Sequence, residues 1–199
     1  MKILVAGATG NTGSRLVHEL CERGHNPVAL VRESSDTGQL PANAERRLGD
    51  LTNLQDSVAE GCEVVIFAAG SGGDTSGEMT DKVDRDGAID LIDKAAKSGA
   101  RRFVMLSSVG AGDPDPQSDL ARYLQAKHDA DEHLKDSTLE YAILRPVALT
   151  DDDATGSVIL GDEVDPKGKA ARGDVAVLLA DAAEKDEWVG QVKLMETAY

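Results

Sequence analysis

A glycine-rich turn near the start of the chain joins a strand-like segment to a helix-like segment, and it limits the possible folds more than any other feature. The strand-like segment is an apolar run over 3–6, long enough for a buried strand. After the turn, Leu16, Val17 and Leu20 recur at helical spacing. The turn reads GATGNTG over 7–13. A strand, a glycine turn and a helix in this order are typical of a phosphate-binding unit.

Each of the three glycines has its own role in such a turn. Gly7 permits the tight turn, Gly10 lets a pyrophosphate approach the backbone, and Gly13 lets the helix pack against the strand. The start of the helix offers free N–H groups and a positive dipole end to the phosphates. The alternative is that the turn needs glycine for its geometry alone. The residues expected to contact a dinucleotide here are Gly7, Thr9, Gly10, Asn11, Thr12 and Gly13.

Strand-like and helix-like segments alternate along the rest of the chain. The apolar runs lie at 28–31, 64–68, 103–106 and 141–144. The helix-like segments lie near 53–60, 81–98, 119–136 and 172–185. This alternation predicts a doubly wound α/β Rossmann fold with a mostly parallel sheet covered on both faces. We expect one domain over 1–199, with a small substrate-facing portion at about 147–170.

Two long loops follow predicted strands. Ser71–Thr80 is rich in glycine, serine and threonine, and Gly110–Ser118 contains Pro114 and Pro116. Both are expected at the carboxyl edge of the sheet, where open α/β sheets bind their ligands.

Composition argues against several classes of partner. The net charge of −15 repels nucleic acid and anionic membranes, and it fits either an ordinary acidic protein or one adapted to high salt. No apolar run approaches the roughly 20 residues of a membrane span, and the early first strand leaves no room for a signal peptide. Cys21 and Cys62 have no metal-binding spacing and are typical of reduced thiols. We therefore expect a cytoplasmic monomer or small homo-oligomer that binds a small-molecule substrate and no metal.

The end of the second strand bears on the choice between NAD and NADP. An NAD site usually has an acidic residue here, on the ribose 2′-OH, but this chain has Arg32 followed by Glu33. A guanidinium can pair with a 2′-phosphate in a forked geometry. Arg32 therefore favours NADP, or NADPH when reduced, over NAD. A shift of one residue would place Glu33 there and reverse the prediction, and Arg32 could also be a solvated surface residue.

Two further strand ends carry candidates for cofactor contacts. Asp50 and Leu51 follow the third strand, where an acidic turn can reach the adenine amino group. Asp50 could equally cap the helix predicted after it. The fourth strand ends in Ala68, Ala69 and Gly70, small residues that would let the cofactor ribose lie close to the backbone, unless they form a plain turn.

The helix predicted over 119–136 has a lysine on its apolar face. At 100° per residue, Asp131 falls outside the apolar stripe together with most charged residues of this helix. An ammonium is costly to bury without a partner, so Tyr123 and Lys127 are a candidate functional pair near the cofactor. Alternatively, Tyr123 belongs to the core and Lys127 reaches solvent. The stripe consists of Leu120, Tyr123, Lys127, Ala130 and Leu134.

The fifth and sixth strands also end in candidate residues. Ser107 and Ser108 end the fifth strand, where a hydroxyl can donate to a substrate carbonyl or simply form a turn. Pro146 ends the sixth strand. It lacks a backbone donor and redirects the chain, and we expect it beside the nicotinamide.

Together, these segments resemble the short-chain dehydrogenase/reductase superfamily. The closer resemblance is to its atypical branch, the NAD(P)-binding proteins related to extended epimerase/dehydratases, NmrA-like proteins and biliverdin reductase B-like flavin reductases. It covers nearly the whole chain. It rests on GATGNTG at 7–13, GDL at 49–51, AAG at 68–70, SSVGA at 107–111, YLQAK at 123–127, LRP at 144–146 and RGDVA at 172–176.

The resemblance implies roles for matching residues. Tyr123 matches the catalytic tyrosine, and Lys127 matches the lysine that holds the nicotinamide ribose and favours ionisation of the tyrosine. Ser108, with Ser107 as the alternative, matches the serine that positions the substrate. The extended family has an asparagine in a helix motif that VDRDGA at 83–88 resembles, and this chain has Asp84 there. This departure affects the proton relay.

The leading prediction is an NADPH-dependent oxidoreductase acting on a small carbonyl, quinone or flavin-like acceptor, with Tyr123 as general acid. One alternative is a nucleotide-sugar epimerase/dehydratase that keeps its cofactor bound. The other is a non-catalytic NADPH/NADP redox sensor. The set of Ser107 or Ser108, Tyr123 and Lys127 favours an enzyme, whereas Asp84 and the short C-terminal part argue against a sugar epimerase.

Overall fold

One large sheet runs through the computed structural model, which describes residues 1–70 and 77–199. Neighbouring strands in this sheet are parallel, except that β8 is antiparallel to β10. β7 (Ala148–Thr150) and β9 (Lys169–Ala171) form a separate parallel pair. The strand order in the large sheet is β3 (Glu45–Leu48), β2 (Asn26–Val31), β1 (Lys2–Ala6), β4 (Val64–Phe67), β5 (Arg102–Leu106), β6 (Glu140–Pro146), β10 (Gln191–Thr197) and β8 (Val158–Leu160).

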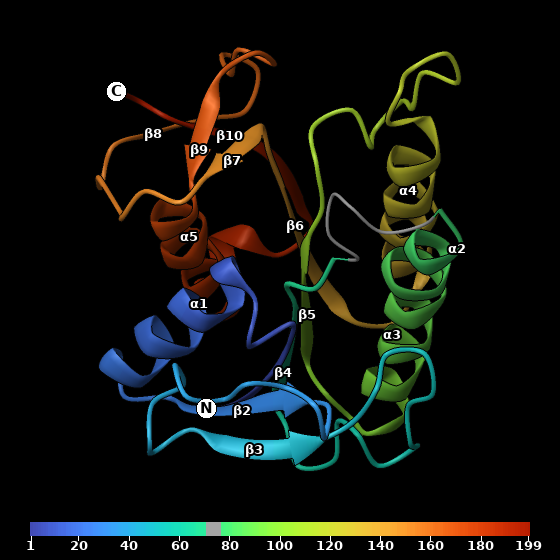
Figure 1. Ribbon diagram of the computed structural model, residues 1–199, viewed down its shortest axis with the longest axis vertical. Coiled ribbons are helices and arrows are strands. Elements are labelled where there is room, and N and C mark those ends of the chain that lie inside the picture. Colours follow the sequence, from blue (N-terminus) through green and yellow to red (C-terminus); the bar gives the residue numbers. More distant parts are fainter. Residues whose placement is uncertain (71–76) are drawn as a thin grey trace.

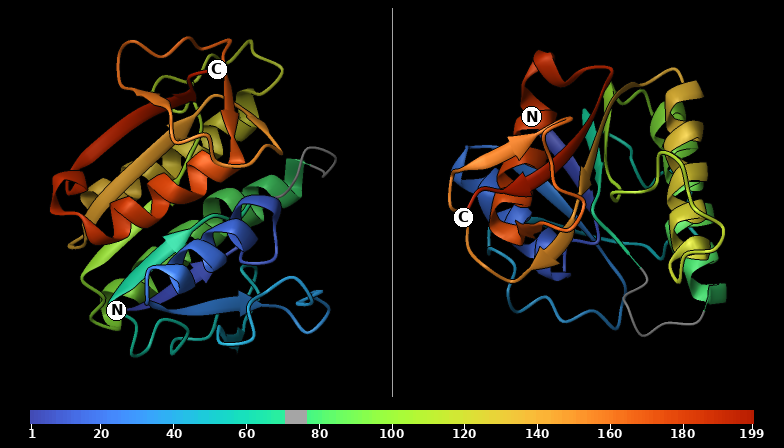
Figure 2. Two further views of the ribbon diagram at one scale, coloured as in Figure 1. Left: turned by 90° about the vertical axis from the view of Figure 1, so that its left-hand side faces the viewer. Right: turned by 90° about the horizontal axis from the view of Figure 1, so that it is seen from above.

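Helices cover both faces of this sheet (Figures 1 and 2). One face carries α1 (Asn11–Glu22) and α5 (Arg172–Glu184). The other carries α3 (Ala88–Lys97) and α4 (Ala121–Asp136). α2 (Gly77–Thr80) and the π-helix η1 (Asp81–Gly87) lead directly into α3, and the short 3₁₀-helix η2 (Asp186–Trp188) follows α5. The predicted doubly wound, mostly parallel α/β Rossmann fold is confirmed.

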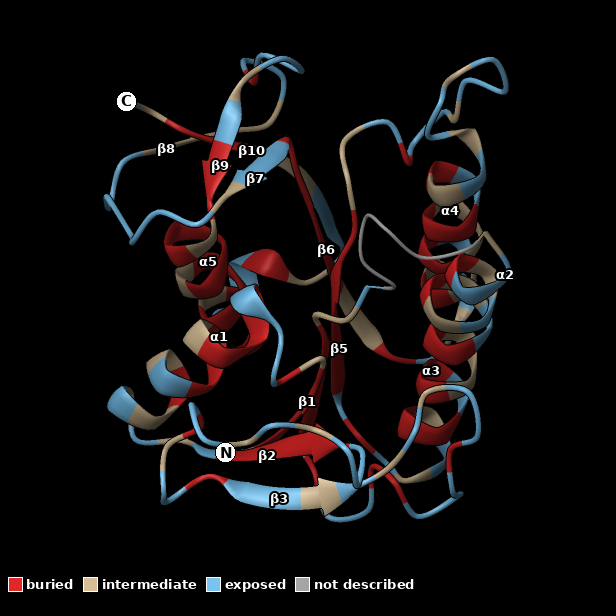
Figure 3. Ribbon diagram, viewed as in Figure 1, coloured by how far each residue is buried: buried red, intermediate tan, exposed pale blue. Residues whose placement is uncertain are grey.

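The alternation of side chains along β1 divides the core into two parts. Ile3 and Val5 pack with residues of α1 and α5, whereas Leu4 and Ala6 pack with residues of α3 and α4. Figure 3 shows the central strands buried along their length. Strands buried on both faces are apolar without interruption, which is why short apolar runs located them in the sequence.

Two expectations about secondary structure need correction. The helix predicted near 53–60 is wrong, because these residues form consecutive turns closed by bonds such as Val58 N to Gln55 O and Glu60 N to Ser57 O. The segment is too short for a helix to be stable without extensive packing. In addition, the four strands β7 to β10 were not predicted. They are short or partly exposed, so their apolar pattern is weak.

The predicted loop at 71–80 is described only in part. Residues 71–76 lie outside the described residues, and Gly77–Thr80 form α2. In the described part of the chain, no helix is both long enough and apolar enough to span a bilayer.

A buried carboxylate ties the start of α5 to the loop between β7 and β8. Asp174 is 2% exposed. Its Oδ1 accepts hydrogen bonds from the backbone N–H groups of Thr155 (2.9 Å) and Gly156 (3.0 Å). Its Oδ2 accepts from the hydroxyls of Thr155 and Thr197, both at 2.9 Å. Gly173 allows this loop to approach, since a Cβ there would lie 2.0 Å from Ala154 N. The RGDVA segment at 172–176 therefore anchors the loop that leads away from β7.

Candidate functional site

The main cavity, of about 620 Å³, opens at the carboxyl ends of β1, β4 and β5. A smaller cavity, of about 420 Å³, lies beside α1 and is described below. The strand order reverses between β1 and β4, which is where open α/β sheets bind ligands. The main cavity brings together several predicted site residues from distant parts of the chain. These are Gly10, Asn11, Thr12, Ala68, Ala69, Gly70, Ser107, Tyr123 and Lys127.

The glycine turn forms one wall of the main cavity, and its backbone is tightly packed. Gly7 has a φ of +81°, and a Cβ there would lie 2.6 Å from Ala69 Cα. A Cβ on Gly13 would lie 2.0 Å from Gly7 O. Gly10 directly precedes α1, and no described side chain caps the N–H groups of the first turn. These free donors and the small residues facing them fit a dinucleotide pyrophosphate.

Lys127 is a buried residue of the cavity wall. Its Nζ lies 3.0 Å from Asp84 Oδ1 and 3.4 Å from the carbonyl oxygens of Ala69 and Leu106. The same atom lies 5.8 Å from the centre of the Tyr123 ring. Burial lowers the pKa of Lys127, but the negative charges that Tyr123 and Asp84 can carry outweigh it, so the pKa lies above its ordinary value. Lys127 is therefore a positively charged group held under Tyr123.

Asp131 departs from the expectation that it would lie outside the buried stripe of α4. It is fully buried, because Arg145 of β6 donates to its Oδ2 from Nε (3.0 Å) and Nη2 (2.9 Å). Burial raises the pKa of Asp131, although Arg145 and Ser107 act in the opposite direction. Leu120 was expected in the buried stripe, but it precedes α4 and is exposed, although it lines the cavity.

Ser107 lines the main cavity, whereas Ser108 does not. The Ser107 hydroxyl donates to Asp131 Oδ2 at 2.8 Å. A serine hydroxyl has one hydrogen, so Ser107 presents acceptor lone pairs to the cavity. This differs from the expected donation to a substrate carbonyl.

The residues predicted for the adenosine half lie along the same edge of the sheet, outside the main cavity. Arg32 directly follows β2 and is exposed, and its guanidinium has no hydrogen-bond partner among the described residues. Asp50 and Leu51 follow β3. The Asp50 carboxylate accepts from Thr52 N at 2.8 Å and from Thr52 Oγ1 at 2.7 Å, and these bonds lower the pKa of Asp50. Asp50 thus closes a turn rather than capping a helix.

Pro146, which was expected beside the nicotinamide, is another predicted residue outside the lining of the main cavity. It is the buried last residue of β6, and its carbonyl accepts from Val109 N at 2.9 Å. Its hydrogen bond is thus with the segment that follows β5 and not with the cavity lining.

Two arginines at the main cavity were missed by sequence reasoning. Arg122 pairs with Asp81 at 2.6 Å, and Arg172 pairs with Asp151 at 3.0 Å. Asp151 Oδ1 also accepts from Asn11 Nδ2 at 3.1 Å, which links the segment after β7 to the glycine turn. Arg172 belongs to the RGDVA segment, so a signal for it was present. Nothing local marks Arg122 or Asp151, because their partners are distant in sequence.

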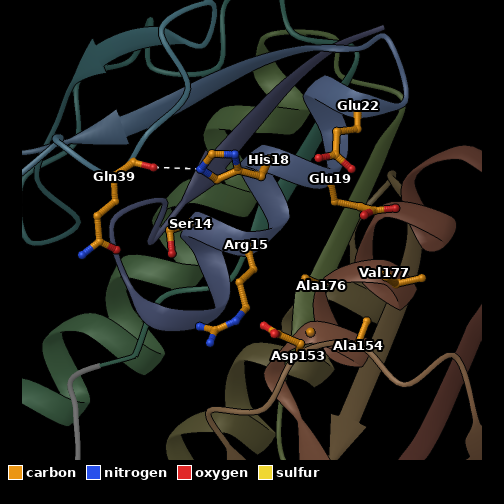
Figure 4. A pocket seen from close by; sticks show the side chains of 11 residues that line it. Ser14, Arg15, His18, Glu19, Glu22, Gln39, Asp153, Ala154, Ala176 and Val177 are labelled. Carbon is orange, nitrogen blue, oxygen red and sulfur yellow. Dashed lines mark hydrogen bonds between the residues drawn. The ribbon is translucent and has the colours of Figure 1, made fainter.

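The smaller hollow of about 420 Å³ lies between α1 and the start of α5 (Figure 4). Its histidine and its arginine already have partners: His18 Nε2 lies 2.9 Å from Gln39 O, and Arg15 donates to Asn11 O and Asp151 O, both at 2.7 Å. It contains neither the glycine turn nor the tyrosine–lysine pair. We therefore place the candidate site in the main cavity.

Comparisons with known proteins show the family to which the chain belongs. A family model described as NAD(P)H-binding matches residues 7–186. An uncharacterized sugar epimerase, YhfK, from Bacillus subtilis (strain 168) is 37% identical over 193 residues, covering 94% of this chain and 90% of its own. A solved Bacillus halodurans structure, described as an NAD-dependent epimerase/dehydratase, has a TM-score of 0.92 at 34% identity and covers 100% of this chain and 94% of its own. The Lactococcus lactis oxidoreductase ylbE has a TM-score of 0.87 at 30% identity, with coverages of 100% and 91%.

Proposed function

We propose that this chain, which belongs to the NAD(P)H-binding family, is an oxidoreductase that uses NADPH to reduce a small carbonyl, quinone or flavin-like acceptor. The main support for the proposal is that Tyr123, Lys127 and Ser107 line the same cavity as the glycine turn. The name of the Lactococcus lactis relative, an oxidoreductase, supports this class of reaction.

The glycine turn and the start of α1 would hold the pyrophosphate through backbone N–H groups, and residues 68–70 would lie against the ribose. When bound, NADPH supplies a hydride, and with it two electrons, to the acceptor. Tyr123 holds the proton that the acceptor gains with the hydride, and it regains one from solvent through the cavity. Lys127, fixed by Asp84, stabilises the phenolate that remains after this transfer.

The test of this function is the Tyr123→Phe variant. We expect it to lose NADPH-dependent turnover about 100-fold or more, because it removes a positioned general acid, while NADPH still binds. The assay is NADPH consumption with a panel of flavins, quinones and aldehydes, together with a fluorescence titration of NADPH. Tyr199→Phe is the control, since Tyr199 is exposed and bonds only to Asp152 and Thr150 among the described residues. Undiminished turnover in Tyr123→Phe would exclude the proposed role.

The preference for NADP is assigned to Arg32. Arg32→Ala should weaken NADPH binding about tenfold or more, because a charge-assisted bond contributes roughly 1.5–3 kcal/mol. NADH binding should stay unchanged, since NADH lacks the 2′-phosphate. Titration of both cofactors measures the ratio, and Arg46→Ala of β3, whose guanidinium donates to Ala44 O, is the matched control. An equal loss for both cofactors would contradict the assignment.

An epimerase or dehydratase is the second candidate, because the Bacillus subtilis and Bacillus halodurans relatives carry such names. It predicts protein that is purified with its cofactor and consumes none overall. A redox sensor predicts tight NADPH binding without turnover on any acceptor of the panel. The same assay and titration therefore distinguish the three functions.

A further inference from the structure

A buried carboxylate, Asp84, lies behind the candidate site, where so far it has been described only as the residue that fixes Lys127. We propose that Asp84 is a positioning residue that sets the pH at which Tyr123 loses its proton, by cancelling much of the charge of Lys127. This inference rests on the proposed role of Tyr123. It identifies a residue that controls the site and differs from the asparagine expected at this position.

The π-helix places Asp84 in the interior. Asp84 and Gly87 are the buried residues of η1, and the wider turn of a π-helix changes the face on which residues fall. Gly87 lets η1 lie against the segment after β3, since a Cβ there would be 2.7 Å from Leu51 O. A Cβ on Gly70 would lie 3.5 Å from Asp84 Oδ1. Asp84 is therefore directly behind the wall formed by residues 68–70.

Lys127 is close to both Tyr123 and Asp84. Its Nζ is 5.8 Å from the centre of the tyrosine ring and 3.0 Å from Asp84 Oδ1. Both members of the ion pair are buried, with side-chain exposures of 3% and 0%. An ammonium alone near a phenol would strongly favour the phenolate. With the carboxylate beside it, the pair acts as a dipole, so its attraction for the phenolate is much weaker.

The other charged groups around the site have partners of their own. Asp131, one turn beyond Lys127 on α4, is held by Arg145 of β6. Arg122 pairs with Asp81 of η1, and Arg172 pairs with Asp151. The exception is Asp119, which also lines the cavity and is exposed to solvent. The raised pKa of Lys127 agrees with this arrangement, since it keeps the lysine charged and paired with Asp84.

The first experiment is a spectrophotometric titration of tyrosine ionisation in Asp84→Asn. Asparagine keeps the size of the side chain and removes its charge, so Tyr123 should ionise about one pH unit lower than in the unmodified protein. Subtracting the same titration in a Tyr123→Phe background isolates Tyr123 from Tyr141 and Tyr199. Asp86→Asn, on the same helix and paired with Arg85 outside the cavity, should leave the titration unchanged. A titration of Asp84→Asn that matches the unmodified protein would overturn the proposal.

A second variant covers the case in which Asp84→Asn does not fold, because it leaves a buried ammonium unpaired. Asp84→Asn combined with Lys127→Met removes both charges together. If Asp84 cancels the lysine, Tyr123 should ionise within about half a pH unit of its original value. A rise of about one unit or more would show that Lys127 acts on Tyr123 unopposed and would refute the proposal. Neither titration needs an acceptor or NADPH. Both therefore test the role of Asp84 even if the protein has no reductase activity.

Discussion

Gly13→Ala is expected to lower the free energy of unfolding by about 3 kcal/mol and to abolish NADPH binding. The added Cβ would lie 2.0 Å from Gly7 O and 2.7 Å from Gly7 C. Both are backbone atoms, so they cannot rotate away, and α1 must move off the turn. Such a movement disrupts the helix start at which the pyrophosphate is expected. Urea denaturation measures the first effect, and a fluorescence titration of NADPH measures the second.

Gly10→Ala is the matched control for this prediction. Gly10 has φ −77° and ψ 167°, which alanine adopts freely, and a Cβ there would be 3.3 Å from Gly7 O. The protein should therefore keep most of its stability. NADPH binding should nevertheless weaken, because Gly10 lines the cavity and its new methyl would face the phosphates. Equal stability of Gly13→Ala and Gly10→Ala would mean that the turn tolerates more movement than its packing implies.

The second large effect is expected for Asp174→Ala, with a loss of about 4 kcal/mol in the free energy of unfolding. Removal of this buried carboxylate leaves three donors without an acceptor: the backbone N–H groups of Thr155 and Gly156 and the buried Thr197 hydroxyl. The Thr155 hydroxyl can still donate to Ser157 O. An unsatisfied buried donor costs about 1–3 kcal/mol. Asp174→Asn should have an intermediate effect, since it keeps one acceptor oxygen. Urea denaturation of both variants measures the difference.

The control for Asp174 is Asp152→Ala in the same loop. Asp152 is exposed, and its Oδ2 accepts from Thr150 Oγ1 at 2.7 Å and Tyr199 OH at 3.0 Å. These donors can bond to water instead, so the urea midpoint should hardly move. If the Asp152 and Asp174 variants were equally stable, the four bonds of Asp174 would not anchor the loop as described.

Much of the fold could be predicted from local patterns. The apolar runs that located β1, β2, β4, β5 and β6 are continuous, because both faces of these strands are buried. Strands β7 to β10 were missed because they are short or because exposed residues interrupt such a run, as in β10. The segment at 53–60 was misassigned because its buried Leu54, Val58 and Ala59 follow helical spacing, although the residues form only turns.

The candidate site was predictable to the extent that its residues follow local signals. The helical stripe indicated that Lys127 turns inward, and the structure buries it. The same stripe placed Asp131 outside the buried face, which is wrong. Periodicity shows where apolar side chains lie, but it cannot show which distant residue pairs with a charged one. Arg145 comes from β6, and it is the ion pair with this arginine that makes burial of Asp131 possible.

By itself, the sequence determined the glycine turn, the central strands and the inward face of Lys127. These depend on steric freedom and spacing within a few residues, which the order of amino acids specifies directly. Only the tertiary structure decided which charges meet: Asp84 with Lys127, Asp131 with Arg145 and Ser107, and Asp174 with the loop after β7. A buried charge is stable only with a partner, and folding brings these partners together from elements that are remote in the chain.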